Sequence, residues 1–237
     1  MTVRPYTVPI HTRLLRIVLR PIFRGVFHLL SDVRIVGREN VPRGGAYLIA
    51  VNHVSLFDPP FLLAFWPIAP EAAGAVDIWD RPGQSLLARL YGGVPVHRGE
   101  YDRQLVEALL GALQAGRPVM IAPEGGRSHQ TGMRRALPGA AYLVEKTAVQ
   151  LVPVGIVGTT DDFLKRALHG QRPRIEMRIG QPVRLPLVEG KGTVRHLARQ
   201  RSADQIMLLI ASLLPSEYRG VYSSGFPIDD GAEGYST

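Results

Sequence analysis

His53 and Asp58 are the residues of this sequence best suited to form a general base. They lie in the segment NHVSLFD, which directly follows an apolar run at 46–51 with the length of a buried strand. α/β proteins place reactive groups at the carboxyl ends of such strands. A carboxylate that accepts one ring N–H fixes the tautomer and leaves the other nitrogen free to take a proton. The spacing predicts an imidazole–carboxylate pair, although a His and an Asp at this distance also occur together by chance.

A second set of polar residues also follows short apolar runs, at 94–96 and 118–122. Glycines let a ligand approach the backbone closely, a carboxylate can line a polar site, and an arginine presents a fork that binds phosphate. These residues predict a binding site for an anionic ligand, although a Pro-Glu-Gly-Gly turn by itself is just as often only a loop. The candidates are Arg98, Glu124, Gly125, Gly126 and Arg127.

Several other kinds of site are excluded by the residue inventory. The chain has no cysteine, which rules out a disulfide framework, a thiolate zinc site and a cysteine nucleophile. It contains no GxSxG, GxxxxGK[ST] or HExxH motif, and the string GTTDD at 158–162 is not a dinucleotide fingerprint. The remaining histidines lack metal-ligand spacing, so no metal site is predicted.

The alternation of short apolar strands with helical segments predicts a single α/β domain with a mostly parallel sheet flanked by helices. The length of 237 residues fits this architecture. Strands are expected at 33–37, 46–51, 74–76, 94–96, 118–122, 150–158 and 174–180. Helices are expected at 10–30, 61–69, 101–115, 138–148 and 194–214. The chain divides into an N-terminal amphipathic segment (1–32), the domain itself (33–215) and a polar, flexible C-terminal tail (216–237).

The net charge of +8, from 28 basic and 20 acidic residues, predicts an anionic partner: nucleic acid, anionic lipid or a phosphorylated substrate. Only three of the basic residues are lysines, so the arginine content could also reflect genome composition. The densest cluster of arginines lies on an N-terminal helix that is otherwise mainly aliphatic. Nucleic-acid binding is disfavoured, because arginines that bind nucleic acid alternate with aromatic residues.

The N-terminal helical segment carries an arginine stripe, because at 100° per residue its four arginines fall within an arc of about 80°. They are Arg13, Arg16, Arg20 and Arg24, and apolar residues fill the rest of the circumference. Four charges make a membrane-spanning helix costly and a signal peptide unsuitable, and Pro21 is expected to kink or divide the segment. We expect a helix at the membrane interface with its arginines at anionic headgroups. The alternative is a helix packed on the protein's own core, with its arginines in solvent.

Four segments in this order resemble the conserved blocks of the glycerolipid acyltransferase family, the HxxxxD acyltransferases of the lysophosphatidic acid type. NHVSLFD (52–58) is similar to the first block, VPVHR (94–98) to the second, APEGGRS (122–128) to the third and LVPVGIVG (151–158) to the fourth. The resemblance covers about residues 33–185. Its specificity lies in four ordered blocks at strand exits rather than in any one string.

The resemblance implies transfer of a fatty acyl group from an acyl-CoA or acyl carrier protein thioester to a lysophospholipid hydroxyl. The acceptor it favours is 1-acylglycerol-3-phosphate, with phosphatidic acid as the product. His53 would act as base and Asp58 would orient it, while the carboxylate, glycines and arginines named above would bind the acceptor. No cofactor is implied, and the expected location is the cytoplasmic face of a membrane, as a peripheral or monotopic protein. The alternatives are another lysolipid or glycolipid acceptor, or a non-catalytic membrane lipid-binding protein of the same fold.

Three positions depart from the family pattern. Gly126 stands where the family usually has threonine, and Leu137-Pro138 stand where Phe-Lys is usual. The basic residue expected ahead of the second block has no counterpart, because residues 71–80 are acidic and apolar.

Overall fold

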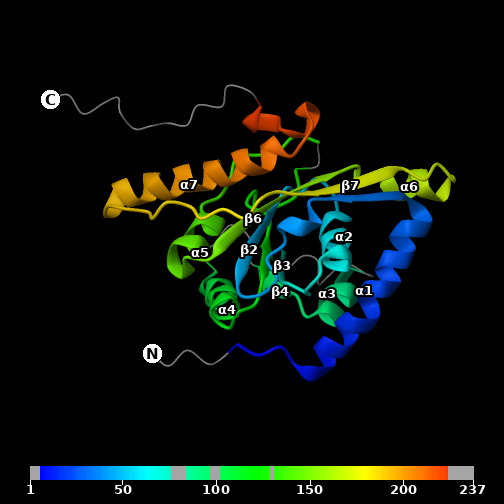
Figure 1. Cartoon of the computed structure of the whole chain (residues 1–237), viewed down its shortest axis with the longest axis horizontal. Coiled ribbons are helices and arrows are strands. Elements are labelled where there is room, and N and C mark those ends of the chain that lie inside the picture. Colours follow the sequence, from blue (N-terminus) through cyan, green and yellow to red (C-terminus); the bar gives the residue numbers. More distant parts are fainter. Residues whose placement is uncertain (1–5, 76–83, 97–101, 129–130, 224–237) are drawn as a thin grey trace.

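Over the residues that the structure describes, seven strands form one sheet in the order β1-β7-β6-β2-β5-β3-β4 (Figure 1). The computed structural model describes residues 6–75, 84–96, 102–128 and 131–223. Neighbouring strands are parallel, except that β6 and β7 run antiparallel. The expected α/β fold with a mostly parallel sheet is therefore confirmed. The strands are β1 (Asp32–Val36), β2 (Tyr47–Val51), β3 (Glu71–Ala75), β4 (Val94–Val96), β5 (Val119–Ile121), β6 (Gln150–Val157) and β7 (Arg174–Ile179).

The helices match the expected segments with informative differences. They are α1 (Ile10–Leu30), α2 (Asp58–Phe65), α3 (Gln84–Tyr91), α4 (Arg103–Gln114), α5 (Gly139–Thr147), α6 (Phe163–Leu168) and α7 (Gly192–Ser212). The short helices α3 and α6 were not predicted. Helix α2 begins at Asp58 rather than at Phe61, because the two prolines that follow Asp58 fit the first turn of a helix, where no N–H is needed. Strand β3 begins at Glu71 rather than at Gly74, because Glu71 pairs with Val119 of β5.

The two faces of the sheet pack on different helices. Along β2, the side chains of Tyr47, Ile49 and Val51 pack with α1 and α2, while Leu48 and Ala50 pack with α4, α5 and α7. This alternation is the period-two pattern of a strand covered on both faces. All five β2 residues are buried, so the segment that leaves this strand starts from a fixed point.

The segment that follows α7 is folded as far as Ser223, although the sequence predicted a flexible tail from residue 216 onward. Two short 3₁₀ turns, Ser216–Tyr218 and Gly220–Tyr222, follow α7. Tyr218 and Tyr222 are buried in the core beside α7, and the Tyr222 hydroxyl donates to Asp204 over 2.6 Å. The expectation of flexibility from residue 216 onward is therefore wrong as far as Ser223, because two aromatic side chains bury their rings there. Residues 224–237 lie outside the described residues.

Helix α1 is continuous through Pro21, so the expected division of the segment there does not occur. Three of its four arginines, Arg16, Arg20 and Arg24, face the protein, whereas Arg13 is exposed. Arg20 and Arg24 donate to main-chain carbonyls at the C-terminal end of α2, where cations complement the helix dipole. Arg16 is buried. For Arg16, Arg20 and Arg24, the expected contacts with anionic headgroups are therefore wrong. The alternative, in which the arginines lie in solvent, is also wrong for these three residues. The outward face is apolar instead, with seven exposed side chains: Ile10, Leu14, Ile17, Val18, Ile22, Val26 and Leu29. Over the described residues, no helix combines the length and hydropathy needed to cross a bilayer.

A buried ion pair fixes α1 to the sheet. Both nitrogens of the Arg16 guanidinium end donate to the Glu71 carboxylate, over 2.9 and 2.7 Å, and the Arg16 plane lies 4.4 Å from the centre of the Tyr91 ring. Arg117 and Tyr6 donate to the same carboxylate. Burial alone raises the pKa of Glu71, but the arginine bonds outweigh it and hold this pKa below its usual value. The carboxylate is thus ionised and fully paired.

We expect Arg16→Met to lower the free energy of unfolding by about 3–5 kcal/mol, because it leaves the buried Glu71 charge with a missing partner. Urea denaturation measures the loss, and Arg13→Met, which alters an exposed arginine of the same helix, should leave stability unchanged. Because folding depresses the pKa of Glu71, its contribution to stability is present above its unfolded pKa and is lost as the pH falls through the folded value. Equal stability of the two variants would show that the ion pair does not hold the helix.

Candidate active site

His53 and Asp58 form the predicted pair. The His53 Nδ1 atom lies 2.9 Å from the Asp58 Oδ2 atom, between the end of β2 and the first residue of α2. The His53 side chain is 16% exposed and that of Asp58 is 2% exposed, so the imidazole is the more accessible of the two. An ionised carboxylate only accepts hydrogen bonds, which assigns the proton to Nδ1. The Nε2 atom then carries a free lone pair and can accept a proton.

The Asp58 carboxylate is held by main-chain donors as well as by His53. The backbone N–H groups of Val54 and Ser55 each donate to Oδ2 over 2.7 Å. These bonds wrap the NHVSLFD segment around the carboxylate, so the turn and the start of α2 form one unit. The other oxygen, Oδ1, accepts from the hydroxyl of Thr159, which follows β6.

Glu124 is positioned differently from the expectation. Its carboxylate accepts the backbone N–H of His53 over 3.0 Å and that of Arg134 over 2.8 Å. Burial raises the pKa of Glu124 above its usual value, although these two N–H groups act against the rise. Both carboxylate oxygens thus bind backbone N–H groups, and Glu124 holds the turn at His53 against the loop after β5. Glu124 is not among the described residues that line the cavity.

The two glycines of the third motif do line the cavity. Gly125 has φ +69°, a left-handed conformation that favours glycine, and a Cβ atom there would also displace the Leu137 side chain. Arg134 donates to the carbonyl oxygens of Glu124 and Gly126, over 3.3 and 2.8 Å. These contacts hold the loop that carries Gly125 and Gly126. The sequence did not indicate this role for Arg134.

Of the two expected phosphate ligands, Arg127 is among the described residues and Arg98 is not. An Arg127 guanidinium nitrogen lies 3.2 Å from the Asp161 carboxylate, whose side chain is 54% exposed. The described cavity lining does not include Arg127. Arg98 lies outside the described residues, so its expected role stays a prediction. Arg127 therefore has an exposed anionic partner in this structure.

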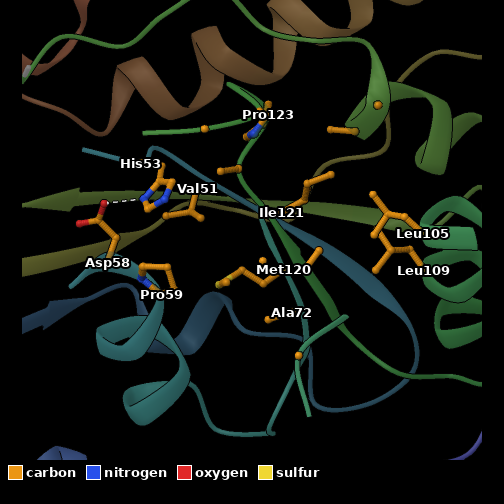
Figure 2. A pocket seen from close by; sticks show the side chains of 18 of the residues that line it. Val51, His53, Asp58, Pro59, Ala72, Leu105, Leu109, Met120, Ile121 and Pro123 are labelled. Atoms are coloured by element: carbon orange, nitrogen blue, oxygen red, sulfur yellow. Dashed lines mark hydrogen bonds and ion pairs between the residues drawn. The ribbon is translucent and has the colours of Figure 1, made fainter. Parts of the chain in front are cut away.

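An apolar cavity of about 730 Å³ opens beside His53. Figure 2 shows His53 and Asp58 on one side of it, Leu105 and Leu109 of α4 on the other, and Met120, Ile121 and Ala72 between them. Helix α1 contributes Leu19 and Phe23 to the lining. A cavity of this size and polarity suits a flexible hydrocarbon chain, with a basic nitrogen at one end.

The cavity lining includes polar and aromatic residues that the sequence did not indicate, among them Tyr142, His196 and Arg199. The Arg199 guanidinium lies 5.0 Å from the centre of the Tyr142 ring and donates to Glu145 over 2.8 Å. The spacing of His196 and Arg199 shows only that they share a helix face. Nothing in the sequence indicates that this face meets the cavity. Among the described residues, no group of three or more histidines, aspartates and glutamates is arranged to hold a metal ion.

The family model described as Acyltransferase matches residues 32–157, which include the strands and motifs of this site. The chain belongs to the acyltransferase family. The resemblance seen in the four sequence blocks is therefore confirmed.

Members of the family from distant organisms are similar to the chain. A 1-acyl-sn-glycerol-3-phosphate acyltransferase of Helicobacter pylori is 29% identical over 56% of this chain and 57% of its own length. One from Chlamydomonas reinhardtii is 28% identical over 79% of this chain and 54% of its own, and one from Borreliella burgdorferi is 24% identical over 59% and 57%. The matched regions thus span little more than half of these relatives.

The fold also matches that of a solved family structure, the 1-acyl-sn-glycerophosphate acyltransferase PlsC of Thermotoga maritima. The TM-score is 0.60 at 22% identity, and the match covers 82% of this chain and 79% of that one. This likeness supports the family's fold for the chain.

Proposed function

We propose that this acyltransferase-family protein transfers a fatty acyl group from a thioester to the hydroxyl of 1-acylglycerol-3-phosphate, giving phosphatidic acid. The observation that carries the proposal is the His53–Asp58 pair, whose free imidazole nitrogen borders the apolar cavity. The names of the relatives support the same acceptor.

In the proposed reaction, His53 Nε2 takes the proton of the acceptor hydroxyl, and Asp58 stabilises the imidazolium that forms. The acceptor oxygen attacks the thioester carbonyl and gives a tetrahedral oxyanion. Collapse of this intermediate forms the ester bond and breaks the carbon–sulfur bond, and the thiolate receives the proton from His53. The acceptor itself is the nucleophile, which agrees with a chain that has neither cysteine nor a serine elbow.

The acyl donor in this proposal is acyl-CoA or acyl carrier protein, and no resident cofactor is needed. The hydrocarbon chain occupies the apolar lining beside β3, β5 and α4. Removal of that chain from water stabilises the complex by about 0.8 kcal/mol per buried CH₂ group.

Arg127 is the proposed ligand of the acceptor phosphate, with Arg98 as a second cation. An exposed ion pair contributes little free energy, about 0–1 kcal/mol, so the Asp161 carboxylate can give way to a phosphate dianion. Arg127 would then exchange its ion pair with Asp161 for one with the acceptor phosphate.

The outward face of α1 is proposed to bind the surface of a lipid bilayer, as a peripheral or monotopic protein does. One face of this helix lines the cavity with Leu19 and Phe23, and the opposite face exposes apolar side chains that include Ile17, Val18 and Ile22. Since Arg16, Arg20 and Arg24 are engaged with the protein, apolar burial rather than headgroup charge would drive the binding.

We expect His53→Ala to lower kcat about 10²–10⁴-fold, the usual contribution of a general base. The assay offers radiolabelled acyl-CoA and acyl carrier protein, separately, to a panel of lysolipids and glycolipids. The matched control is His169→Ala, which alters an exposed histidine that contacts only its own helix in the described residues. Full turnover by the His53 variant would remove it as the base. Absence of transfer by the unaltered protein across the whole panel would favour the non-catalytic lipid-binding alternative.

For Arg127→Ala we expect kcat/KM for phosphorylated acceptors to fall about tenfold to a hundredfold, because a charge-assisted bond contributes about 1.5–3 kcal/mol. Uncharged acceptors should be unaffected. Asp161→Asn should lower the KM for the phosphorylated acceptor, because it removes the competing carboxylate. Equal losses with charged and uncharged acceptors would contradict the role of Arg127 and favour a non-phosphorylated lipid.

The double variant Ile17→Glu/Ile22→Glu should lose binding to neutral phosphatidylcholine vesicles in a sedimentation assay. The control Leu187→Glu/Val194→Glu makes the same change in net charge at exposed apolar residues on the far side of the sheet. If the control and the α1 variant lose binding equally, net charge drives the association rather than the apolar face.

A further inference from the structure

The loop after β6 lies beyond the family match, and the proposed function uses only its Asp161, as the partner of Arg127. Its sequence, GTTDD at 158–162, begins one residue beyond the matched region. Thr159 is completely buried, although threonine carries a polar group that is costly to bury without a partner. Its hydroxyl donates to the Oδ1 atom of Asp58, 101 positions away in the sequence.

This bond completes the set of donors around Asp58. The Oδ2 atom accepts from His53 and from two backbone N–H groups of the local turn. Those three donors hold one oxygen, around which the carboxylate could still rotate. The Thr159 hydroxyl holds the second oxygen from the end of the neighbouring strand β6, so donors from two strand ends fix the plane of the carboxylate.

Thr159 is itself held firmly. The Asn52 side chain bridges β2 to β6 through both the N–H and the carbonyl of Ile156, over 2.7 and 2.9 Å. The backbone N–H of Gly158 donates to the Tyr218 hydroxyl over 3.0 Å. Gly158 has φ +88°, and a Cβ atom there would lie 2.1 Å from the carbonyl oxygen of Arg174. The backbone before Thr159 is therefore fixed, which holds the Thr159 hydroxyl beside the Oδ1 atom of Asp58.

We propose that Thr159 is a positioning residue for acyl transfer: it orients the Asp58 carboxylate, which in turn orients the His53 imidazole toward the cavity. This inference rests on the proposed function. Without the hydroxyl, Oδ1 is buried and unpaired, and the carboxylate turns toward other donors. The direction of the Nδ1–H bond then changes, and with it the direction of the Nε2 lone pair. Substrate binding is unaffected, because Thr159 is not among the described residues that line the cavity.

The test compares the isosteric Thr159→Val with Thr159→Ser, which keeps the hydroxyl. Thr159→Val should lower kcat about tenfold, the equivalent of one such bond, with the KM values of donor and acceptor unchanged. Thr159→Ser should restore kcat. The matched control is Thr160→Val, which removes the same atoms from the next residue, whose hydroxyl bonds to Asp162.

A double-variant cycle separates positioning from a merely structural role. In an Asp58→Asn background, Thr159→Val should cause no further loss of kcat, because the group through which Thr159 acts is already altered. An additional tenfold loss there would overturn the proposal. If Thr159→Val does not fold, Thr159→Cys takes its place: a thiol is the weaker donor, so kcat should fall between the serine and valine values.

The outcomes also separate this inference from the proposed function. An unaltered protein without acyl transfer refutes the proposed function. An active protein in which Thr159→Val and Thr160→Val both retain full kcat refutes the role of Thr159 alone.

Discussion

The buried carboxylate of Asp58 is the constraint on which the rest of the site depends. An ionised carboxylate loses several kcal/mol of hydration when it is buried, and only a full set of donors compensates for this loss. Here the donors come from the turn after β2, from His53 and from the loop after β6. The end of β2, the start of α2 and the end of β6 must therefore all be in their native positions before the charge is satisfied. The same geometry leaves one imidazole nitrogen free beside an apolar cavity.

Carboxylates elsewhere in the protein also act as anchors. Glu124 accepts two backbone N–H groups and holds the third motif against the His53 turn. Glu71 accepts Arg16 and Arg117 and holds the N-terminal helix against β3. In each case a buried carboxylate ties together separate segments of the sequence. A side chain of a family motif can therefore bind backbone N–H groups and stabilise the fold of the site, as Glu124 does.

Helix α1 shows why amphipathicity alone does not determine orientation. The arginine stripe and the apolar stripe are both regular, and either could face the core. Arg16, Arg20 and Arg24 face inward because the end of α2 offers unpaired carbonyl groups and Glu71 offers a buried carboxylate, and both need cationic donors. Satisfying those groups turns seven apolar side chains outward. The excess of positive charge is thus partly structural, and the outward face of the helix is mainly apolar, although Arg13 is exposed.

The fold class and the central pair could be predicted from the sequence because both depend on local patterns. Short apolar runs separated by helical periods indicate a parallel sheet, and reactive residues at strand exits meet at one edge of it. His53 and Asp58 are five positions apart, so one turn was enough to bring them together. The sequence by itself thus determined the sheet, the strand exits and the His53–Asp58 pair. Tertiary structure alone decided the direction of the α1 arginines, the anchoring role of Glu124, the Asp161 partner of Arg127 and the bond from Thr159 to Asp58. Each of these depends on a buried or partly buried charge that finds its partner across more than thirty residues, and no local pattern encodes such a pairing.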